Sequence, residues 1–138
     1  MVDEETLKRR IDVLLDALAD LRRYRDRFTA AALTSDRDAQ HMVQHALYVA
    51  AQAAIDIALH ASAAKEQPSA GTYQQAFDRL AAAGLLDSVL AERMRGWAGL
   101  RNVLAHQYGT IDHARIAATL AHELGDLEEF ARAAAGWR

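Results

Sequence analysis

The sequence predicts an all-α fold, an up-and-down bundle of four to five helices that forms a single domain over residues 1–138. Apolar residues recur every three or four positions over several long stretches, which is the spacing of an amphipathic helix. The chain has one proline and seven glycines, so few residues interrupt these helices. No stretch shows the strict alternation of apolar and polar residues that a half-buried strand would need.

Two long helices come first. Over about residues 4–32, an apolar stripe at helical spacing contains Leu7, Ile11, Leu14, Leu15, Leu18, Leu21 and Phe28. The segment LTSDRD, residues 33–38, breaks this pattern and offers Ser35 or Asp36 as the N-cap of a second helix. That helix extends to about residue 64, and its many small inward-facing residues let a neighbouring helix approach closely.

A linker and a capping pattern precede the third helix. The segment KEQPSAG, residues 65–71, holds the only proline of the chain. Thr72 and Gln75 then form the T-x-x-Q pattern of a capping box, which opens a short helix. We expect this helix to end at Ala83, with Gly84 as the residue that follows the C-cap.

Two further helices complete the predicted bundle. Asp87 can cap the fourth, which Gly109 ends and whose core face carries Leu90, Met94, Trp97, Leu100 and Leu104. Asp112 can cap the fifth, whose core face carries Ile116, Leu120, Leu124, Leu127 and Phe130. Gly96 and Gly99 lower the helix propensity of the fourth helix, so we expect them at a close helix–helix crossing.

Composition and charge exclude several classes of protein. The net charge of −3 gives no general attraction to nucleic acid, so contact with RNA would need a local basic patch. The absence of cysteine excludes disulfides and thiolate metal sites. The N-terminal stretch lacks the apolar segment of a secretory signal, and no apolar run approaches the roughly 20 residues that span a bilayer. We therefore expect a cytoplasmic protein without a membrane partner.

The stretch RNVLAHQYG, residues 101–109, gathers chemically useful side chains at the end of the fourth helix. At about 100° per residue, its four long polar side chains share one face of the helix, and the apolar residues occupy the other. These four residues are Arg101, Asn102, His106 and Tyr108. An exposed polar arc at a helix end is also common as ordinary solvated surface, where a histidine interacts favourably with the helix dipole.

The same group contains the parts needed for RNA cleavage without a metal or another cofactor. A histidine titrates near pH 6.5 and can exchange a proton with a ribose hydroxyl, so His106 is a candidate acid or base. The guanidinium of Arg101 can bind the scissile phosphate. Asn102 can orient either group, and Tyr108 can stack on a base. A two-fold dimer would bring a second histidine to a shared cleft.

The pattern R-N-x-L-x-H-x-Y in this stretch resembles the R-x4-H-x-Y signature of HEPN-domain proteins, and more closely the HepT toxin family. The segments AAIDIALH at 53–60, SAGTYQQAFDRLAAAGLLD at 69–87 and LAERMRGWAGLRN at 90–102 also resemble that family. The resemblance covers nearly the whole chain, with the helices in the same order.

The resemblance implies an all-α homodimer whose motif residues line a cleft at the dimer interface and act as a metal-independent ribonuclease. It implies Arg101 and His106 as the catalytic pair and Asn102 as a supporting residue. It also implies a partner, a minimal nucleotidyltransferase antitoxin, which silences the toxin by transferring AMP to Tyr108. A bulky anion on this tyrosine would block the phosphate site beside the arginine and repel RNA.

The chain departs from the family pattern at one position, and the family suggests further candidates at another. Leu59 stands where many relatives have an asparagine after IDIA. Some relatives use an acidic residue at the start of the second helix, so Asp36 and Asp38 are possible accessory residues. For Asp36, a role as N-cap is an equally good explanation.

Two other features have both a functional and an ordinary interpretation. The stretch LRRYRDRF, residues 21–28, could be the local basic patch, although its arginines point around much of the helix, as on a solvated face. His41 and His45 are one helical turn apart, but no H-E-x-x-H pattern surrounds them, so we expect no metal site.

The sequence thus favours an RNA-cleaving toxin subunit, an endoribonuclease-type enzyme neutralised by AMP transfer. The alternative is a non-catalytic helical subunit that binds a nucleotidyltransferase or its nucleotide, in which case the same polar arc would be a docking surface. The complete R-x4-H-x-Y set favours the enzyme, because a binding module does not need the histidine.

Overall fold

The computed structural model describes residues 3–68, 70–106 and 108–137 of the chain. Within these residues all regular secondary structure is helical, which confirms the predicted fold class. The elements, in chain order, are α1 (Glu4–Arg27), α2 (Ala30–Ser35), α3 (Arg37–Ala64), α4 (Tyr73–Ala82), α5 (Ser88–His106), the 3-10 helix η1 (Tyr108–Thr110), α6 (His113–His122) and α7 (Leu124–Ala135).

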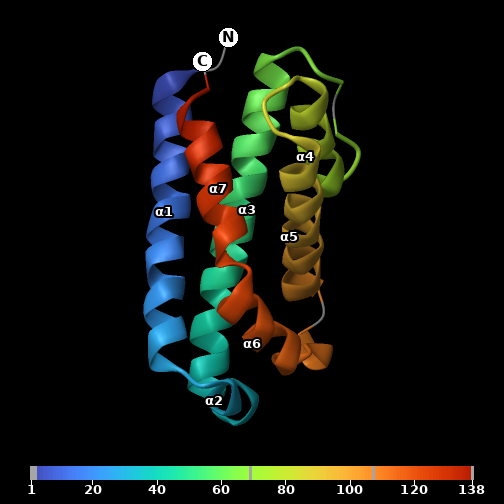
Figure 1. Cartoon of the computed structure of the whole chain (residues 1–138). Coiled ribbons are helices and arrows are strands. Elements are labelled where there is room, and N and C mark those ends of the chain that lie inside the picture. The colour runs from blue at the N-terminus through green and yellow to red at the C-terminus, as the bar shows by residue number, and fades with distance from the viewer. Residues whose placement is uncertain (1–2, 69, 107, 138) are drawn as a thin grey trace.

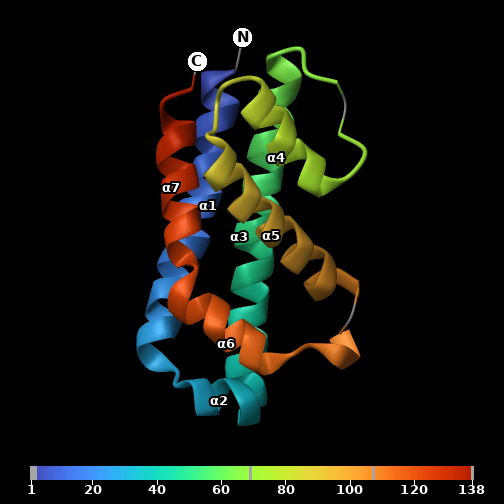
Figure 2. The same cartoon turned by 45° about the vertical axis from the view of Figure 1, so that its right-hand side comes forward.

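The helix α3 lies at the centre of the bundle. It packs against α1, α4, α5 and α7, while the short helices α2 and α6 contact each other at one end of the molecule (Figure 1). The N- and C-terminal ends of the chain lie together at the opposite end, and Figure 2 shows α5 descending across α3 from that end. This arrangement places the end of α5 beside the first half of α3.

The central position of α3 explains its composition. By length and hydropathy alone it could cross a membrane, but 61% of its most apolar window is buried inside the bundle. Small residues such as Ala50, Ala54 and Ala58 are fully buried, and they allow neighbouring helices to pack closely around it. The helix is thus the core helix of the bundle.

Aromatic side chains close the core near the end that holds the termini. Phe77 of α4 meets Phe130 of α7 edge to face, with ring centroids 5.6 Å apart. Phe130 in turn meets Trp137 at 5.8 Å, again edge to face. This geometry is the favoured one for aromatic pairs. The three rings therefore form one cluster that joins α4, α7 and the residue Trp137 after α7.

The predicted helix caps are confirmed. Asp36 accepts hydrogen bonds from the backbone amides of Asp38 (2.9 Å) and Ala39 (3.3 Å) at the start of α3. Asp87 accepts one from Leu90 (2.8 Å) at the start of α5. Asp112 caps α6 in the same way.

The capping box at α4 differs in one bond from the expected pattern. The Thr72 hydroxyl accepts from the Gln75 amide at 3.2 Å, as predicted. The Gln75 side chain, however, accepts from the amide of Gly71 at 2.7 Å. At the other end of α4, Gly84 follows the C-cap Ala83 with a φ of 76°, the left-handed conformation that favours glycine there.

The first predicted helix is in fact two helices. α1 ends at Arg27, because Phe28 has an extended backbone and the Thr29 hydroxyl caps α2 by accepting from Ala32 at 3.1 Å. Asp36, one of the two N-cap residues expected for the second helix, therefore begins α3, the third helix of the structure. Leu15 was also predicted to lie in the core, but it is 44% exposed.

The last predicted helix is also two helices, so the described residues form seven α-helices where four to five were expected. Glu123 interrupts the helix between α6 and α7, with φ −114° and ψ 1°. α6 packs on α2, whereas α7 packs on α1 and α5. The apolar stripe continues through this break because both halves bury it, but against different neighbours.

The expected close crossing at the glycines of α5 is wrong for Gly96. A Cβ atom at that position would meet no atom within 4 Å. At Gly99 it would meet only the Gln74 side chain, at 3.8 Å. Among the described residues, no backbone atom of another helix lies within 4 Å of the Cβ position of either glycine.

Candidate functional site

The end of α5 carries the predicted site residues. Arg101 and Asn102 are half-buried, and His106, the last residue of α5, is exposed. The backbone of Tyr108 begins η1, but its side chain lies outside the part of the chain that the structure describes. Its predicted role therefore stays a prediction.

A pocket of about 640 Å³ lies between α3 and the end of α5. It is lined by His41, Gln44, His45, Tyr48, Arg101, Leu104, Ala105 and His106. The two members of the predicted catalytic pair thus line the same pocket, five residues apart on α5. The opposite wall consists of polar side chains of α3.

Arg101 is held by neutral groups. Its Nε donates to the Oε1 of Gln52 at 2.7 Å, its Nη1 to the Oδ1 of Asn102 at 3.3 Å, and its Nη2 to the Tyr48 hydroxyl at 3.4 Å. The guanidinium also lies over two aromatic rings, 4.9 Å from the centroid of Tyr73 and 5.5 Å from that of Tyr48.

These contacts orient the cation without neutralising it. An arginine side chain has five N–H donors, and the described residues engage three of them, one on each nitrogen. No carboxylate among the described residues forms an ion pair with Arg101. The guanidinium can therefore offer its charge and a further donor on each terminal nitrogen to an anion in the pocket.

Four of the side chains around Arg101 or on the pocket wall were not predicted from the sequence: Gln44, Tyr48, Gln52 and Tyr73. One available signal was that Gln44, Tyr48, Gln52 and Asp56 repeat every four residues along α3, a helix that is otherwise rich in alanine. Residues four apart lie on the same helix face. Nothing comparable in the sequence pointed to Tyr73.

Several histidines gather near the pocket. His41 and His45 line it from α3, and the Nε2 of Gln44 lies 3.4 Å from the Nδ1 of His113 at the start of α6. Within the described residues, no group of three or more histidine, aspartate or glutamate side chains is arranged to hold a metal ion. The ionisable side chains that line the pocket are those of three histidines, Tyr48 and Arg101.

The two acidic candidates lie outside the pocket lining. Asp36 is the N-cap of α3, and Asp38 is exposed in its first turn. The pocket begins one turn later, at His41. The capping bonds account for Asp36, and an accessory role for either residue stays a prediction.

The basic stretch of α1 is engaged in local contacts. Arg22 pairs with Glu128 of α7, and Arg23 pairs with Asp20 at 2.8 Å. Arg27 lies over the ring of Phe28, 5.0 Å from its centroid. None of these arginines lines the pocket. The stretch is therefore a surface of α1 on which some arginines form ion pairs with carboxylates.

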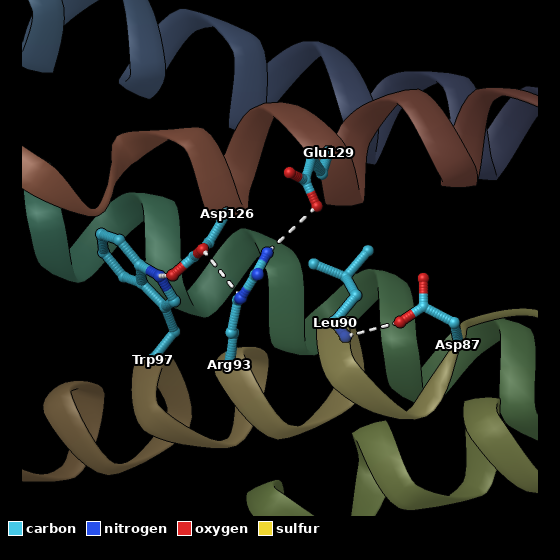
Figure 3. Close-up of polar contacts among 6 residues, drawn as sticks. All are labelled: Asp87, Leu90, Arg93, Trp97, Asp126 and Glu129. Carbon is cyan, nitrogen blue, oxygen red and sulfur yellow. Dashed lines mark hydrogen bonds and ion pairs between the residues drawn. The ribbon is translucent and has the colours of Figure 1, made fainter.

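A second polar cluster lies two turns earlier on α5 (Figure 3). Arg93 approaches Asp126 at 4.0 Å and Glu129 at 3.4 Å, and the indole N–H of Trp97 donates to Asp126 at 3.3 Å. A smaller cavity of about 200 Å³ adjoins this cluster. Burial raises the pKa of Asp126 above its ordinary value, and the bonds from Trp97 and Arg93 oppose that rise.

A family model matches most of the chain. The model, described as Ribonuclease HepT-like, matches residues 14–134 of the chain. No curated protein sequence matches the chain.

Solved structures with the same fold include toxin–antitoxin complexes. A chain of a toxin–antitoxin complex with AMP-PNP has a TM-score of 0.85 and 20% identity, over 94% of this chain and 96% of that chain. A chain in the complex of a tri-AMPylated Shewanella oneidensis HEPN toxin with an MNT antitoxin has a TM-score of 0.84 and 22% identity, over 96% and 97%. The cytosolic protein YutE of Bacillus subtilis, of unknown function, has a TM-score of 0.82 and 13% identity, over 96% and 87%.

Proposed function

This chain belongs to the HepT-like family, and from that premise we propose that it is the toxin subunit of a toxin–antitoxin pair, a metal-independent endoribonuclease. The observation that carries the proposal is a pocket lined both by Arg101, whose partners among the described residues are neutral, and by the exposed His106. An arginine held only by neutral partners suits a phosphate diester, which brings its own negative charge.

The proposed reaction is a transesterification within the RNA, in which the phosphorus exchanges its bond to the 5′-oxygen for a bond to the 2′-oxygen. His106 takes the proton of the ribose 2′-hydroxyl, and the 2′-oxygen forms a bond to phosphorus. The bond from phosphorus to the 5′-oxygen then breaks, and that oxygen receives a proton. The products are a 2′,3′-cyclic phosphate and a 5′-hydroxyl, and Arg101 stabilises the extra negative charge on the phosphorus oxygens during the transfer.

A homodimer would complete this acid–base chemistry. One imidazole removes a proton while another donates one, and a two-fold axis beside the pocket would supply a second His106 from the other protomer. The fold is that of HEPN toxin structures, and the resemblance described above implies such a dimer. We therefore propose the homodimer as the active form, in the cytoplasm.

AMP transfer to Tyr108 is the proposed means of control. The Shewanella oneidensis toxin of the same fold is described as tri-AMPylated and in complex with an MNT antitoxin. Tyr108 follows His106 by two residues, so a nucleotide attached to it would bring phosphate to the same end of α5. The added anion would compete with RNA for Arg101. The proposed partner is thus a minimal nucleotidyltransferase antitoxin.

The test is RNA cleavage in excess EDTA by the purified protein, after mass spectrometry has shown that Tyr108 carries no AMP. The variant His106→Ala removes the proposed base, and His122→Ala is its matched control, because His122 is the exposed last residue of α6. We expect cleavage by the parent and by the control, and a loss of at least about 100-fold in His106→Ala.

The outcomes separate the proposed enzyme from its alternative. If His106→Ala cuts RNA as fast as the parent, the pocket is not the nuclease site. If none of the three proteins cuts RNA but all bind the nucleotidyltransferase, the chain is a non-catalytic subunit and the polar arc is a docking surface. Loss of both cleavage and partner binding in His106→Ala alone would also favour a docking surface.

A further inference from the structure

The side chain of Gln52 makes hydrogen bonds in two directions. Its Oε1 accepts from the Nε of Arg101 at 2.7 Å, and its Nε2 donates to the Oδ1 of Asp56 at 2.9 Å. A carboxylate can only accept, so Asp56 requires the NH₂ end of the amide to face it. The carbonyl end of Gln52 must then face Arg101, which can only donate.

We propose that Asp56 and Gln52 form a positioning relay, in which the carboxylate sets the orientation of the amide and the amide sets the orientation of the Arg101 guanidinium. This inference rests on the proposed function of Arg101 as the phosphate-binding group. Neither residue touches the reacting atoms in this scheme. They act through the arginine, and the sequence signature of the site includes neither of them.

The geometry of α3 explains why these residues work together. Tyr48, Gln52 and Asp56 are separated by four residues each, which places them in one row on a helix face. Tyr48 contacts the guanidinium with its hydroxyl and its ring, and Gln52 contacts the Nε. The third member of the row, Asp56, accepts its hydrogen bond from Gln52 and not from the arginine.

The neutral amide between the two charges is the central feature of the relay. A carboxylate in direct contact with Arg101 would form an ion pair, as Asp126 does with Arg93, and would compete with a phosphate for the cation. Gln52 passes on the orienting effect of Asp56 while keeping its negative charge one side chain away. Coulomb attraction falls with distance, so the arginine remains available to an anion.

The first readout is independent of RNA cleavage. In a ¹⁵N-labelled sample, the Nε–Hε signal of Arg101 can be assigned by its loss in Arg101→Lys. A hydrogen bond to Gln52 protects this proton from exchange with water. Loss of one hydrogen bond to a charged group corresponds to roughly tenfold faster exchange or more. The second readout is the rate of RNA cleavage.

Four variants separate orientation from charge. Gln52→Leu removes the acceptor, so exchange should accelerate roughly tenfold and kcat should fall. Asp56→Leu leaves the Gln52 amide free to rotate, so exchange should accelerate and kcat should fall, but by less than in Gln52→Leu. Asp56→Asn keeps an acceptor oxygen and should restore values near the parent. Gln52→Glu keeps Arg101 protected from exchange but adds a charge, so KM for RNA should rise.

A matched control guards against a loss of structure. Gln40 lies on α3 outside the pocket lining, so Gln40→Leu should leave both readouts unchanged. The unfolding midpoint of each variant shows whether it is folded. If Gln52→Leu does not fold, Asp56→Leu and Asp56→Asn together test the relay, because only Asp56→Asn keeps an acceptor oxygen for the Gln52 amide.

The two readouts also distinguish the relay from the proposed function. If the exchange pattern follows the prediction but the parent does not cut RNA, the relay stands and the nuclease proposal fails. If the parent cuts RNA and neither readout changes in Gln52→Leu, the relay is wrong and the nuclease proposal stands. Equal effects of Asp56→Asn and Asp56→Leu would also overturn the relay, because then the acceptor oxygen does not matter.

Discussion

Two arginines eight residues apart on α5 show how the surroundings of a cation decide its role. Arg93 is paired with the carboxylates of Asp126 and Glu129 (Figure 3). Arg101 is held by an amide, a second amide and a phenol, with aromatic rings beside it. Both side chains are held by several contacts, but among the described residues only Arg93 is paired with carboxylates.

The difference assigns different tasks to the two regions. The Arg93 cluster joins α5 to α7, and its partly exposed ion pairs contribute little beyond that connection. The Arg101 site joins α5 to α3 and α4 through neutral contacts and keeps a positive charge at the pocket. An unbalanced, oriented charge in a pocket is what the binding of a phosphate needs.

Removal of each arginine should give the largest contrast. We expect Arg101→Ala to lower RNA cleavage by about 100- to 1000-fold, because stabilisation of the transition-state charge is lost. Arg93→Ala should leave cleavage unchanged and lower the free energy of unfolding by no more than about 1 kcal/mol. Cleavage assays and urea unfolding of both variants test this pair. Equal loss of activity in the two would show that the comparison is wrong.

The aromatic contacts of the site should matter next. Tyr73→Leu removes the ring beside the Arg101 guanidinium, and a cation–π contact is worth about 0.5–2 kcal/mol. Cleavage should therefore fall by roughly 2- to 30-fold. Tyr73→Phe keeps the ring and should retain the parent rate. A Phe variant as slow as the Leu variant would point to the hydroxyl instead of the ring.

Replacement of Gly96 and of Gly84 by alanine should change the free energy of unfolding in opposite directions. Gly96 lies on the face of α5 that adjoins the Arg93 cluster, and a Cβ there meets open space. Gly96→Ala should raise the free energy of unfolding by roughly 1 kcal/mol through helix propensity. Gly84 has a φ of 76°, so Gly84→Ala should lower it by about 1–2 kcal/mol. Denaturant unfolding at low and high protein concentration measures both changes, and a destabilising Gly96→Ala would contradict the open-space geometry.

The smallest expected effect concerns the pH dependence of the Arg93 cluster. Burial raises the pKa of Asp126 above its ordinary value of 3.8, so the folded state holds this proton more tightly than the unfolded state. The group therefore stabilises the fold below pH 3.8, and this contribution is lost as the pH rises through the raised pKa.

The variant Asp126→Asn tests this sign. It cannot titrate, so its stability relative to the parent should improve as the pH rises from 3.8 to 7 in urea unfolding. Glu128 gives the opposite control, because the hydrogen bond from Arg22 lowers its pKa. The contribution of Glu128 to stability is lost as the pH falls. The free energy of unfolding of Glu128→Gln should therefore decrease relative to that of the parent as the pH rises over the same range.

Much of the local structure could be predicted from the sequence. Asp87 and Asp112 were identified as N-caps and Asp36 as one of two candidates beside Ser35, and each of the three aspartates makes its capping bond with an amide two or three residues away. Gly84 was identified as the residue after a C-cap for a similar reason. These interactions involve neighbours in the chain, so their geometry follows from the residue types and their order.

The helix breaks could not be predicted in the same way. The apolar stripe through Ile116, Leu120, Leu124 and Leu127 is continuous, and all four residues are buried. The break at Glu123 arises because α6 and α7 bury their stripes against different helices. Periodicity reports that a face is buried but does not identify its neighbour.

The order of residues is enough to predict that the chain is all-helical, where most helices begin, and that Arg101 and His106 share the end of one helix. The surroundings of these two residues depend on the packing of the bundle. Gln52 and Tyr48 precede Arg101 by 49 and 53 residues, and Tyr73 comes from another helix again. Helix formation and capping depend on residues within one turn, whereas the partners of Arg101 depend on how α3, α4 and α5 pack together. The neutral setting of this arginine is therefore a property of the packed bundle.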